Sequence, residues 1–522
     1  MSQRLAHAET LDYRAFLPQG QGRIFDFYEK IGELGEGGFG DVWLARERVR
    51  ASTAEETEGR QVAIKRVRKP NPGAGLDEEE ADSETAVVDL HTEVELLKSL
   101  DHPGICRLLN VYEDAKSLYL VMERIAGCEL FDRIMALGSF SEPDAMQVIK
   151  QVASALLYCH EHGVVHRDIK PENILVVDPQ EGDGPQDMVV KVIDFGFGCR
   201  ILRGVKLKAQ VGTFLYTAPE VLSTSSCDEK VDLWALGCLL FVMLSGNSPF
   251  FGGDVRDRIV QGRYSFEAEE WADVSDAAKD LVRGLLLVDP AARLSASDVL
   301  AHPWIEANAS PSQLQRPALQ KTLDAMRNYQ QQSSLRHLCT GVLARQLDEA
   351  QLHELHMAFS QLDADQNGIL TMGEVRRAYE ESAIAPVEEI QQLLASIDMD
   401  GDGEVDYTEF IAACLDKRVQ EQEASCWAAF RVFDVDGNGR ISFQELHSVV
   451  KSADLHGTFS PSTLDQIWRE LVGEELQDAP QEHLGGEVDF DRFLAALGNV
   501  ELAKVHRKLS AHEAAKPTLA AR

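Results

Sequence analysis

Three segments in the C-terminal third of the chain place oxygen-bearing groups at the same positions. Each fits the pattern D-x-[DN]-x-[DN]-G-x5-E, in which the side chains at positions 1, 3 and 5, the carbonyl at position 7 and a bidentate glutamate at position 12 can surround one cation. Calcium is a hard cation that takes about six to eight oxygen ligands, so this set suits Ca2+. The expected ligand residues are Asp363, Asp365, Asn367, Ile369 and Glu374 in the first loop, Asp398, Asp400, Asp402, Glu404 and Glu409 in the second, and Asp434, Asp436, Asn438, Arg440 and Glu445 in the third.

The three loops recur at a regular interval, since they begin at residues 363, 398 and 434. A repeated helix–loop–helix unit produces such a period. A fourth unit shows only its second half, over residues 486–493, and Arg492 occupies its position 12. A cation there repels calcium, so we expect this unit to bind none and to pair with the third. The second loop carries the most carboxylates, which predicts the tightest site unless repulsion among them reverses the order.

A different set of short motifs occupies the N-terminal three-fifths of the chain. A glycine-rich turn at residues 35–42 precedes the strand-like run VAIK at residues 62–65. Glycines let a backbone approach phosphate groups closely, and alone this turn would suit a dinucleotide equally well. The segments HRDIKPEN at residues 166–173, DFG at 194–196 and APE at 218–220 follow in that order.

Together these motifs resemble those of the protein kinase family, over residues 28–305. The resemblance implies transfer of the γ-phosphate of ATP, with Mg2+ ions held by Asn173 and Asp194. It also implies that Asp168 orients the substrate hydroxyl and that Lys170 lies near the transferring phosphate. The catalytic residues that it implies are Asp168, Lys170, Asn173, Lys65, Glu93, Asp194 and Thr213. The nucleotide-contacting residues that it implies are Leu34, Gly35, Glu36, Gly37, Gly38, Phe39, Gly40, Val42, Ala63, Lys65, Met122, Glu123, Ile125, Glu129 and Leu175.

The same resemblance implies substrate preferences. Lys170 is the residue of serine/threonine kinases rather than tyrosine kinases. Glu129 and Glu172 match positions that, in the calcium/calmodulin-kinase group, favour a basic residue three before the target hydroxyl. In many such kinases Arg167 binds a phosphate or an acid on the activation segment, yet residues 197–211 contain no Ser, Thr, Tyr, Asp or Glu. We therefore expect that this segment is not a phosphorylation switch.

Two further features that the resemblance implies are structural. Glu220 is expected to form a buried ion pair with Arg293. Asp232 and Trp234, on a long apolar run, resemble the residues that support the catalytic loop, here residues 166–173, from below.

Composition narrows the class of protein. The 522 residues carry a formal net charge of −35 and nine singly spaced cysteines, with no C-x-x-C pair. This acidity argues against a nucleic-acid partner and agrees with cation binding. Single cysteines fit reduced thiols better than a disulfide framework. The start of the sequence resembles neither a signal peptide nor a myristoylation site, and the most apolar run, residues 233–244, is too short to span a bilayer. We therefore expect a soluble, cytoplasmic protein.

The segment between the kinase-like part and the first calcium loop carries apolar residues at helical spacing. The two sets are Leu319, Leu323 and Met326, and Leu335, Leu338 and Val342. One interpretation is a helical linker. The other is an autoinhibitory segment whose apolar face becomes the target of the calcium-binding part. Lys321 is our candidate in this segment for the residue that blocks the active-site cleft.

Kinase, junction and four calcium-binding units in this order resemble the calcium-dependent protein kinases of plants and apicomplexan-type protists. That resemblance implies a calcium-activated serine/threonine kinase in which the calcium-binding units wrap the junction and release the cleft. We predict a multidomain chain, with a bilobal α+β protein kinase fold followed by an all-α EF-hand domain. The predicted divisions are a leader at 1–27, a kinase domain at 28–305 (N-lobe 28–122, C-lobe 126–305, insertions near 47–60 and 70–86), a junction at 306–347, an EF-hand domain at 348–500 and a tail at 501–522.

Two other interpretations use the same motifs. A calcium-sensing pseudokinase would transfer nothing, but such proteins usually lack Lys65, Asp168, Asn173 or Asp194, and all four are present. A kinase activated by a separate calmodulin would make the built-in calcium loops redundant. We expect a monomer that acts on protein substrates carrying serine or threonine in a basic context.

Overall fold

The computed structural model describes most of the chain. The described residues are 19–20, 23–37, 40–48, 59–69, 93–178, 188–201, 207–208, 213–224, 226–308, 316–347, 349–382, 385–399, 402–415, 423–453, 461–472 and 486–498. Most of the leader, most of the insertion at 47–60, the insertion at 70–86 and the tail at 501–522 lie outside them. Gly38, Phe39 and Asp400 also lie outside them, and only the backbone of Glu36 and Gly37 is described.

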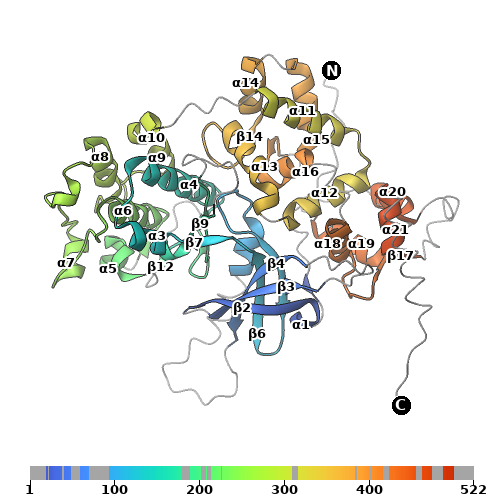
Figure 1. Cartoon of the computed structure of the whole chain (residues 1–522), viewed down its shortest axis with the longest axis horizontal. Coiled ribbons are helices and arrows are strands. Elements are labelled where there is room, and N and C mark those ends of the chain that lie inside the picture. Colours follow the sequence, from blue (N-terminus) through green and yellow to red (C-terminus); the bar gives the residue numbers. More distant parts are fainter. Residues whose placement is uncertain are drawn as a thin grey trace.

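The N-terminal lobe is built on a six-stranded sheet with the order β1-β5-β6-β4-β3-β2, at the lower centre of Figure 1. Its strands are β1 (Gln19–Gly20), β2 (Tyr28–Gly37), β3 (Gly40–Glu47), β4 (Gln61–Arg68), β5 (Leu108–Glu113) and β6 (Ser117–Glu123), with helix α1 (Ile24–Phe27) before β2. Residues 93–99 are helical. Side chains alternate along a strand. On β4, Val62 and Ile64 therefore join Trp43 in one core cluster, while Lys65 lies on the opposite face.

The second lobe is mainly helical and lies at the left of Figure 1. Its central helix, α6 (Lys230–Ser245), is apolar on all sides and almost wholly buried, as a helix in the middle of a core should be. In the described part of the chain, neither this helix nor any other is both long and apolar enough to cross a membrane. The other helices are α3 (Leu130–Leu137), α4 (Glu142–Glu161), α5 (Pro219–Thr224), α7 (Val255–Val260), α8 (Asp276–Leu285), α9 (Ala296–Leu300) and α10 (Pro303–Asn308).

Short strands of this lobe position its loops. The strands β10 (Val190–Val192), β9 (Ile174–Val177) and β7 (Gly127–Glu129) form one sheet, while β8 (Val164–Val165) pairs with β11 (Cys199–Arg200) and β12 (Leu207–Lys208) with β13 (Ser226–Cys227). Turns of 3-10 helix cover Pro171–Asn173, Phe214–Tyr216 and Glu269–Trp271. The catalytic loop thus runs from β8 to β9, and the DFG motif follows β10.

Helices make up the C-terminal part, at the upper right of Figure 1. They are α11 (Arg316–Gln330), α12 (Ser334–Gln346), α13 (Glu349–Leu362), α14 (Met372–Ser382), α15 (Val387–Ile397), α16 (Tyr407–Cys414), α18 (Glu423–Phe433), α19 (Phe443–Ala453), α20 (Pro461–Val472) and α21 (Phe490–Ala496). Two short ladders join the loop units in pairs, β14 (Leu370–Thr371) with β15 (Glu404–Val405) and β16 (Arg440–Ser442) with β17 (Glu487–Asp489). The second ladder confirms that the fourth unit pairs with the third.

The junction helices α11 and α12 pack into the core of the C-terminal part. Leu319, Leu323 and Met326 of α11 are each 1% exposed, and they share one apolar cluster with Phe359 and Ile411. Helix α11 contacts α15 and α16, and α12 contacts α16 and α18. The predicted helical spacing is confirmed, and the helices of the loop units cover its apolar face.

Candidate active site and calcium sites

A buried lysine lies between two carboxylates. Lys65 Nζ on β4 is 2.7 Å from Glu93 Oε1 and 2.7 Å from Asp194 Oδ1, which follows β10. Burial alone would lower the pKa of Lys65, but the two carboxylates outweigh it and raise that pKa. Burial also opposes ionisation of Asp194, yet the charge of Lys65 lowers its pKa. Both groups are therefore charged near neutral pH, and the predicted contact between Lys65 and Glu93 is present.

Three neighbours fix the carboxylate of Asp168. Lys170 Nζ lies 2.7 Å from Asp168 Oδ2, and Asn173 Nδ2 donates to the same oxygen at 2.9 Å. Thr213 donates to Oδ1 through its N–H and its hydroxyl, each at 3.0 Å. The structure thus brings together the catalytic-loop residues and Thr213, which the chain separates by 45 positions from Asp168.

The catalytic loop rests on Asp232, a fully buried residue of α6. Its carboxylate accepts the N–H groups of His166 and Arg167 at 2.9 and 2.8 Å and contacts His160 Nε2 at 2.9 Å. Burial opposes ionisation, but these hydrogen bonds, that from His160 first, lower the pKa of Asp232. Arg167 has φ 67°, a strained value that the held amides maintain. Its guanidinium donates to the carbonyl of Phe197, a main-chain group. The support predicted for Asp232 is confirmed.

The residues predicted to contact a nucleotide lie on strands of both lobes. Ala63 on β4 is paired with Met122 on β6, and Leu175 on β9 with Glu129 on β7. Gly40 has φ 140°, and a Cβ there would lie 1.9 Å from a backbone oxygen. Only glycine therefore fits this end of the β2–β3 turn. Of the other predicted contacts, Leu34, Gly35 and the backbone of Glu36 and Gly37 lie on β2, Val42 lies on β3 and Ile125 follows β6.

Glu129 and Glu172, the residues predicted to meet a basic substrate, lie in an acidic environment. Partial desolvation and then the charges of Asp132 and Glu172 raise the pKa of Glu129, and Lys170 only partly offsets them. Glu129 is exposed at the end of β7. A cationic side chain of a partner would relieve the repulsion between these carboxylates.

Residues 123–125, which we call the hinge, join the two lobes, and Glu123 is the last residue of β6. Glu123 has a second set of contacts that the sequence did not predict. Its carboxylate is fully buried and pairs with Arg107 Nη2 at 3.0 Å and with Lys191 Nζ at 3.1 Å. Only the main chain of Glu123 therefore remains to meet a nucleotide. Sequence reasoning missed Arg107 and Lys191, because neither lies in a motif and Lys191 is 68 positions away from Glu123.

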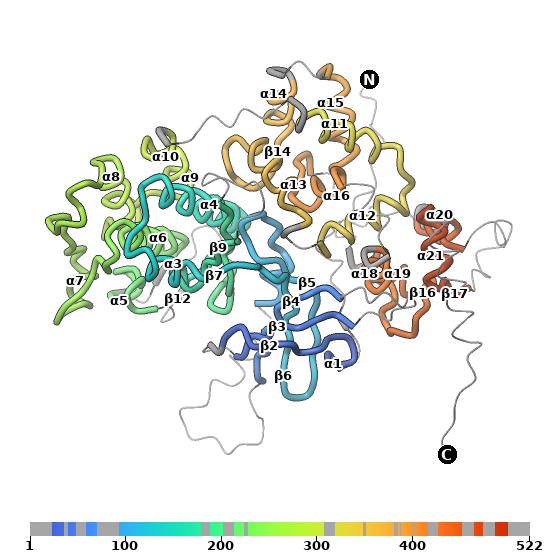
Figure 2. Tube along the Cα trace, viewed as in Figure 1, coloured from blue at the N-terminus to red at the C-terminus, as the bar shows by residue number. Residues whose placement is uncertain are grey.

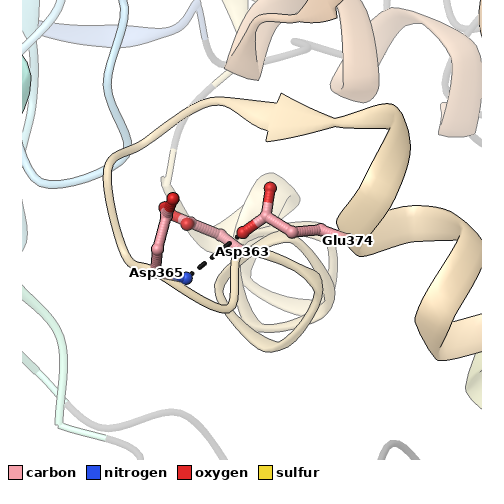
Figure 3. Close-up of side chains that lie close together, drawn as sticks. All are labelled: Asp363, Asp365 and Glu374. Atoms are coloured by element: carbon pink, nitrogen blue, oxygen red, sulfur yellow. Dashed lines mark hydrogen bonds between the residues drawn. The ribbon is translucent and has the colours of Figure 1, made fainter.

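The first calcium loop brings its carboxylates together. One oxygen each from Asp363, Asp365 and Glu374 lies within 4.8 Å of the others. Figure 3 shows these three side chains close together in the loop. Glu374 Oε1 accepts the N–H groups of Ala364 and Asp365, and Gly368, with φ 83°, donates to Asp363 Oδ2 at 2.9 Å. Burial and then the neighbouring carboxylates raise the pKa of Asp363 to about 8. Such a cluster is balanced by a cation, and the oxygen ligands fit Ca2+.

The other two loops repeat the arrangement as far as they are described. In the third loop, oxygens of Asp434, Asp436 and Glu445 converge, and burial followed by the neighbouring carboxylates raises the pKa of Asp434 to about 6. In the second loop, Asp398 and Glu409 accept backbone N–H groups in the same way. The remaining predicted ligands with a described position are Asn367, Ile369, Asp402, Glu404, Asn438 and Arg440.

The first two calcium loops touch the kinase-like part through residues beside their ligands. The hydroxyl of Ser154 on α4 donates to the carbonyl of Gln366 in the first loop at 2.6 Å. Thr408, which precedes a ligand of the second loop, donates to Asp101 through its N–H and its hydroxyl, each at 2.8 Å. Asp101 and Thr408 are both buried. These bonds join residues 212 and 307 positions apart, and no local pattern predicts them.

The third calcium loop is joined to the N-terminal lobe by Arg431 of α18. Its guanidinium pairs with Glu47 on β3 and lies over the rings of Phe27 and Tyr28, at 5.0 and 5.9 Å from their centroids. It also donates to the hydroxyl of Tyr112 at 3.3 Å. Burial would lower the pKa of Arg431, but Glu47, Tyr28 and Tyr112 together outweigh burial and raise it.

Known proteins match this chain over both parts. Residues 28–305 match the protein kinase domain family, residues 353–415 the EF-hand domain pair family and residues 426–453 the EF hand domain family. The chain is 33% identical over 473 residues to calcium-dependent protein kinase 5 of Plasmodium falciparum (isolate 3D7), covering 90% of the chain and 77% of that protein. It is 33% identical over 476 residues to calcium-dependent protein kinase 33 of Arabidopsis thaliana, covering 90% of the chain and 84% of that protein.

Proposed function

Because the chain belongs to the calcium-dependent protein kinase family, and is therefore a calcium-regulated protein serine/threonine kinase, we propose three finer features of its activity. It phosphorylates serine or threonine in a basic context, using ATP and Mg2+. Its junction inhibits the kinase when calcium is low. Calcium binding to its own EF-hands removes that inhibition. The proposal is supported above all by the orientation of Asp168, with Lys170, Asn173 and Thr213 around its carboxylate.

The described residues suit phosphoryl transfer by positioning and charge stabilisation. Bound ATP with Mg2+ supplies the phosphoryl group and part of the positive charge. Asp168, fixed by its neighbours, orients the substrate hydroxyl and accepts its proton. Lys170 places a positive charge 2.7 Å from that carboxylate. Lys65, held by Glu93, places another at the nucleotide phosphates.

Asn173 and Asp194 fit the role of magnesium ligands. The amide nitrogen of Asn173 donates to the carbonyl and the carboxylate of Asp168, at 2.8 and 2.9 Å, so the amide oxygen is its ligand atom. Burial opposes the ionisation of Asp194, but Lys65 lowers the pKa of Asp194 and keeps that carboxylate ionised. Carboxylate and amide oxygens are the ligand type that Mg2+ prefers.

The packing of α11 supports the proposed inhibition by the junction. Its apolar face is covered by the helices of the EF-hand part, so any rearrangement of those helices at low calcium exposes it. An exposed apolar face of this kind binds another surface, and we propose that it then occupies the kinase cleft. Lys321, our candidate for the blocking residue, pairs here with Glu354 of α13 at 2.7 Å, and both side chains are exposed. Its blocking role stays a prediction for the calcium-free state.

Phosphate transfer from ATP to a serine peptide with arginine three residues upstream tests the proposal, with and without micromolar calcium. We expect activity that requires calcium and falls at least about a thousandfold in Asp168→Asn. A peptide with alanine in place of arginine should have a lower kcat/KM. The substitution Glu129→Gln should reduce the difference in kcat/KM between the two peptides. Equal activity with and without calcium would contradict the inhibition, and equal use of both peptides would contradict the basic context.

A further inference from the structure

Three charged side chains lie buried together behind the hinge. Arg107, Glu123 and Lys191 are 5%, 1% and 0% exposed. Glu123 accepts from Arg107 Nε and Nη2 at 3.2 and 3.0 Å and from Lys191 Nζ at 3.1 Å. One carboxylate therefore faces two cations. A buried cation is costly unless oxygen acceptors surround it, so Arg107 gains from oxygen partners in addition to this carboxylate.

The end of the junction supplies them. Arg107 Nη1 donates to the carbonyl of Ala344 at 3.0 Å, and Nη2 donates to the carbonyl of Leu347 at 2.5 Å. Helix α12 ends at Gln346, and the last carbonyls of a helix lack partners within the helix and carry the negative end of its dipole. The guanidinium thus joins the C-terminal end of α12 to Glu123.

Arg107 also holds the main chain at the hinge. Its N–H donates to Glu123 Oε1 at 2.9 Å, and the N–H of Glu123 donates to the carbonyl of Arg107 at 3.0 Å. Helix α12 also contacts α16 and α18, the helices that adjoin the second and third calcium loops. Helix α12 therefore lies between the N-terminal lobe and the EF-hand helices, as Figure 2 shows.

We propose that Arg107 is a positioning residue that couples calcium binding to the nucleotide hinge, because the docked end of α12 completes its set of acceptors. The proposal rests on the proposed function and names the connection by which the EF-hand part acts on the kinase. With α12 docked, Arg107 holds both Glu123 and the helix end, and the hinge is fixed. With α12 displaced, Arg107 loses the carbonyls of Ala344 and Leu347 as acceptors, and the hinge loses that restraint.

The substitution Arg107→Met in the full chain tests this coupling, since it keeps the ion pair between Glu123 and Lys191. We expect about tenfold weaker calcium binding, measured by competition with a chromophoric chelator, and an equal rise in the half-activating calcium concentration. At saturating calcium the KM for ATP should rise about fivefold while kcat stays within about twofold. The rise in Tm that calcium produces should shrink, with little change of Tm in chelator.

Two matched variants separate coupling from simple loss of stability. Arg107→Lys keeps the charge but cannot reach Glu123 and both carbonyls, so its calcium affinity and KM should fall between those of the wild type and Arg107→Met. Arg293→Met removes a buried arginine that pairs with Glu220 at 2.8 Å inside the kinase part, and it should lower Tm equally with and without calcium.

The proposal is overturned if Arg107→Met and Arg107→Lys leave calcium affinity and the KM for ATP unchanged while lowering Tm equally in both conditions. Direct calcium binding and Tm require no phosphate transfer. A wild type without kinase activity would therefore contradict the proposed function, and the effect of Arg107 on calcium binding would still decide the coupling.

Discussion

The first and third calcium loops share a ligand pattern and differ in what surrounds it. At position 7, Ile369 of the first loop is 7% exposed and packs in the core cluster of the kinase part. At the same position, Arg440 of the third loop is exposed and pairs with Glu487 of the fourth unit at 2.6 Å. Position 7 binds calcium through its carbonyl, so its side chain is free to serve another contact. The first loop uses that side chain to meet the kinase, and the third uses it to meet its paired unit.

The comparison predicts its largest effect for loss of a position-12 ligand. Glu374→Gln and Glu445→Gln each remove one bidentate carboxylate, from the first and the third loop. Because the first loop packs against the kinase, we expect Glu374→Gln to raise the half-activating calcium concentration on the order of a hundredfold, against about tenfold or less for Glu445→Gln. Calcium titration of kinase activity measures both. Equal shifts would show that the surroundings of the loops do not matter.

A smaller effect is expected from the side chains at position 7, which leave the ligand atoms unchanged. Ile369→Ala opens a cavity against the kinase core, at a cost of about 2–5 kcal/mol, and should raise the half-activating calcium concentration about tenfold. Arg440→Ala removes an exposed ion pair worth about 0–1 kcal/mol and should leave that concentration within about twofold. If Arg440→Ala had the stronger effect, the roles assigned to the two loops would be reversed.

A third difference concerns pH in the absence of calcium. The pKa of Asp363 is raised to about 8 and that of Asp434 to about 6, whereas both titrate near 4 when unfolded. The folded state thus binds more protons than the unfolded state between these values, so its stability falls as pH rises. In chelator we expect Asp363→Asn to remove a decline of Tm that extends to about pH 8. Asp434→Asn should remove a smaller contribution to the decline of Tm, one that ends at about pH 6. If Asp363→Asn left the decline of Tm unchanged, the raised pKa assigned to Asp363 would be contradicted.

The smallest effect is expected at the fourth unit. Arg492→Glu restores the position-12 carboxylate of this unit, but the sequence has Gln481, His483 and Gly485 at its first, third and fifth positions. One restored ligand does not make a calcium site. Equilibrium dialysis should therefore find the same number of calcium ions bound to Arg492→Glu and to the wild type. An additional ion in the variant would show that the backbone of this unit is already arranged for calcium.

The sequence predicted the parts of the molecule that contiguous motifs encode. The first calcium loop is one example, since the spacing of Asp363, Asp365 and Glu374 places their oxygens together on any such loop. The ion pair of Glu220 with Arg293, at 2.8 Å, was predicted through family resemblance and is confirmed. At Gly40 the structure adds a reason that the sequence did not provide, because its φ of 140° excludes a side chain.

The contacts between the two halves could not be predicted in this way. Arg107 reaches carbonyls of the junction 237 and 240 positions further along the chain, and a backbone carbonyl has no identity that a sequence pattern can reveal. In the sequence, nothing distinguishes Arg431 from other helix residues. Its contacts with Glu47 and Phe27 are visible only in the folded structure. Such partners depend on how two folded surfaces meet, and local periodicity contains no information about that meeting.

The bond between Asp101 and Thr408 has a consequence for how this gene can change. Neither residue is a predicted calcium ligand or catalytic residue, so a survey of those positions would treat both as neutral, yet their side chains form hydrogen bonds with each other in a buried setting. Substitution of either residue leaves a buried polar group of the other without these hydrogen bonds, which lowers stability. Positions 101 and 408 should therefore covary among related proteins. An EF-hand segment transplanted from a distant relative would still bind calcium. It would lack the hydrogen bonds that connect the second calcium loop to the kinase part.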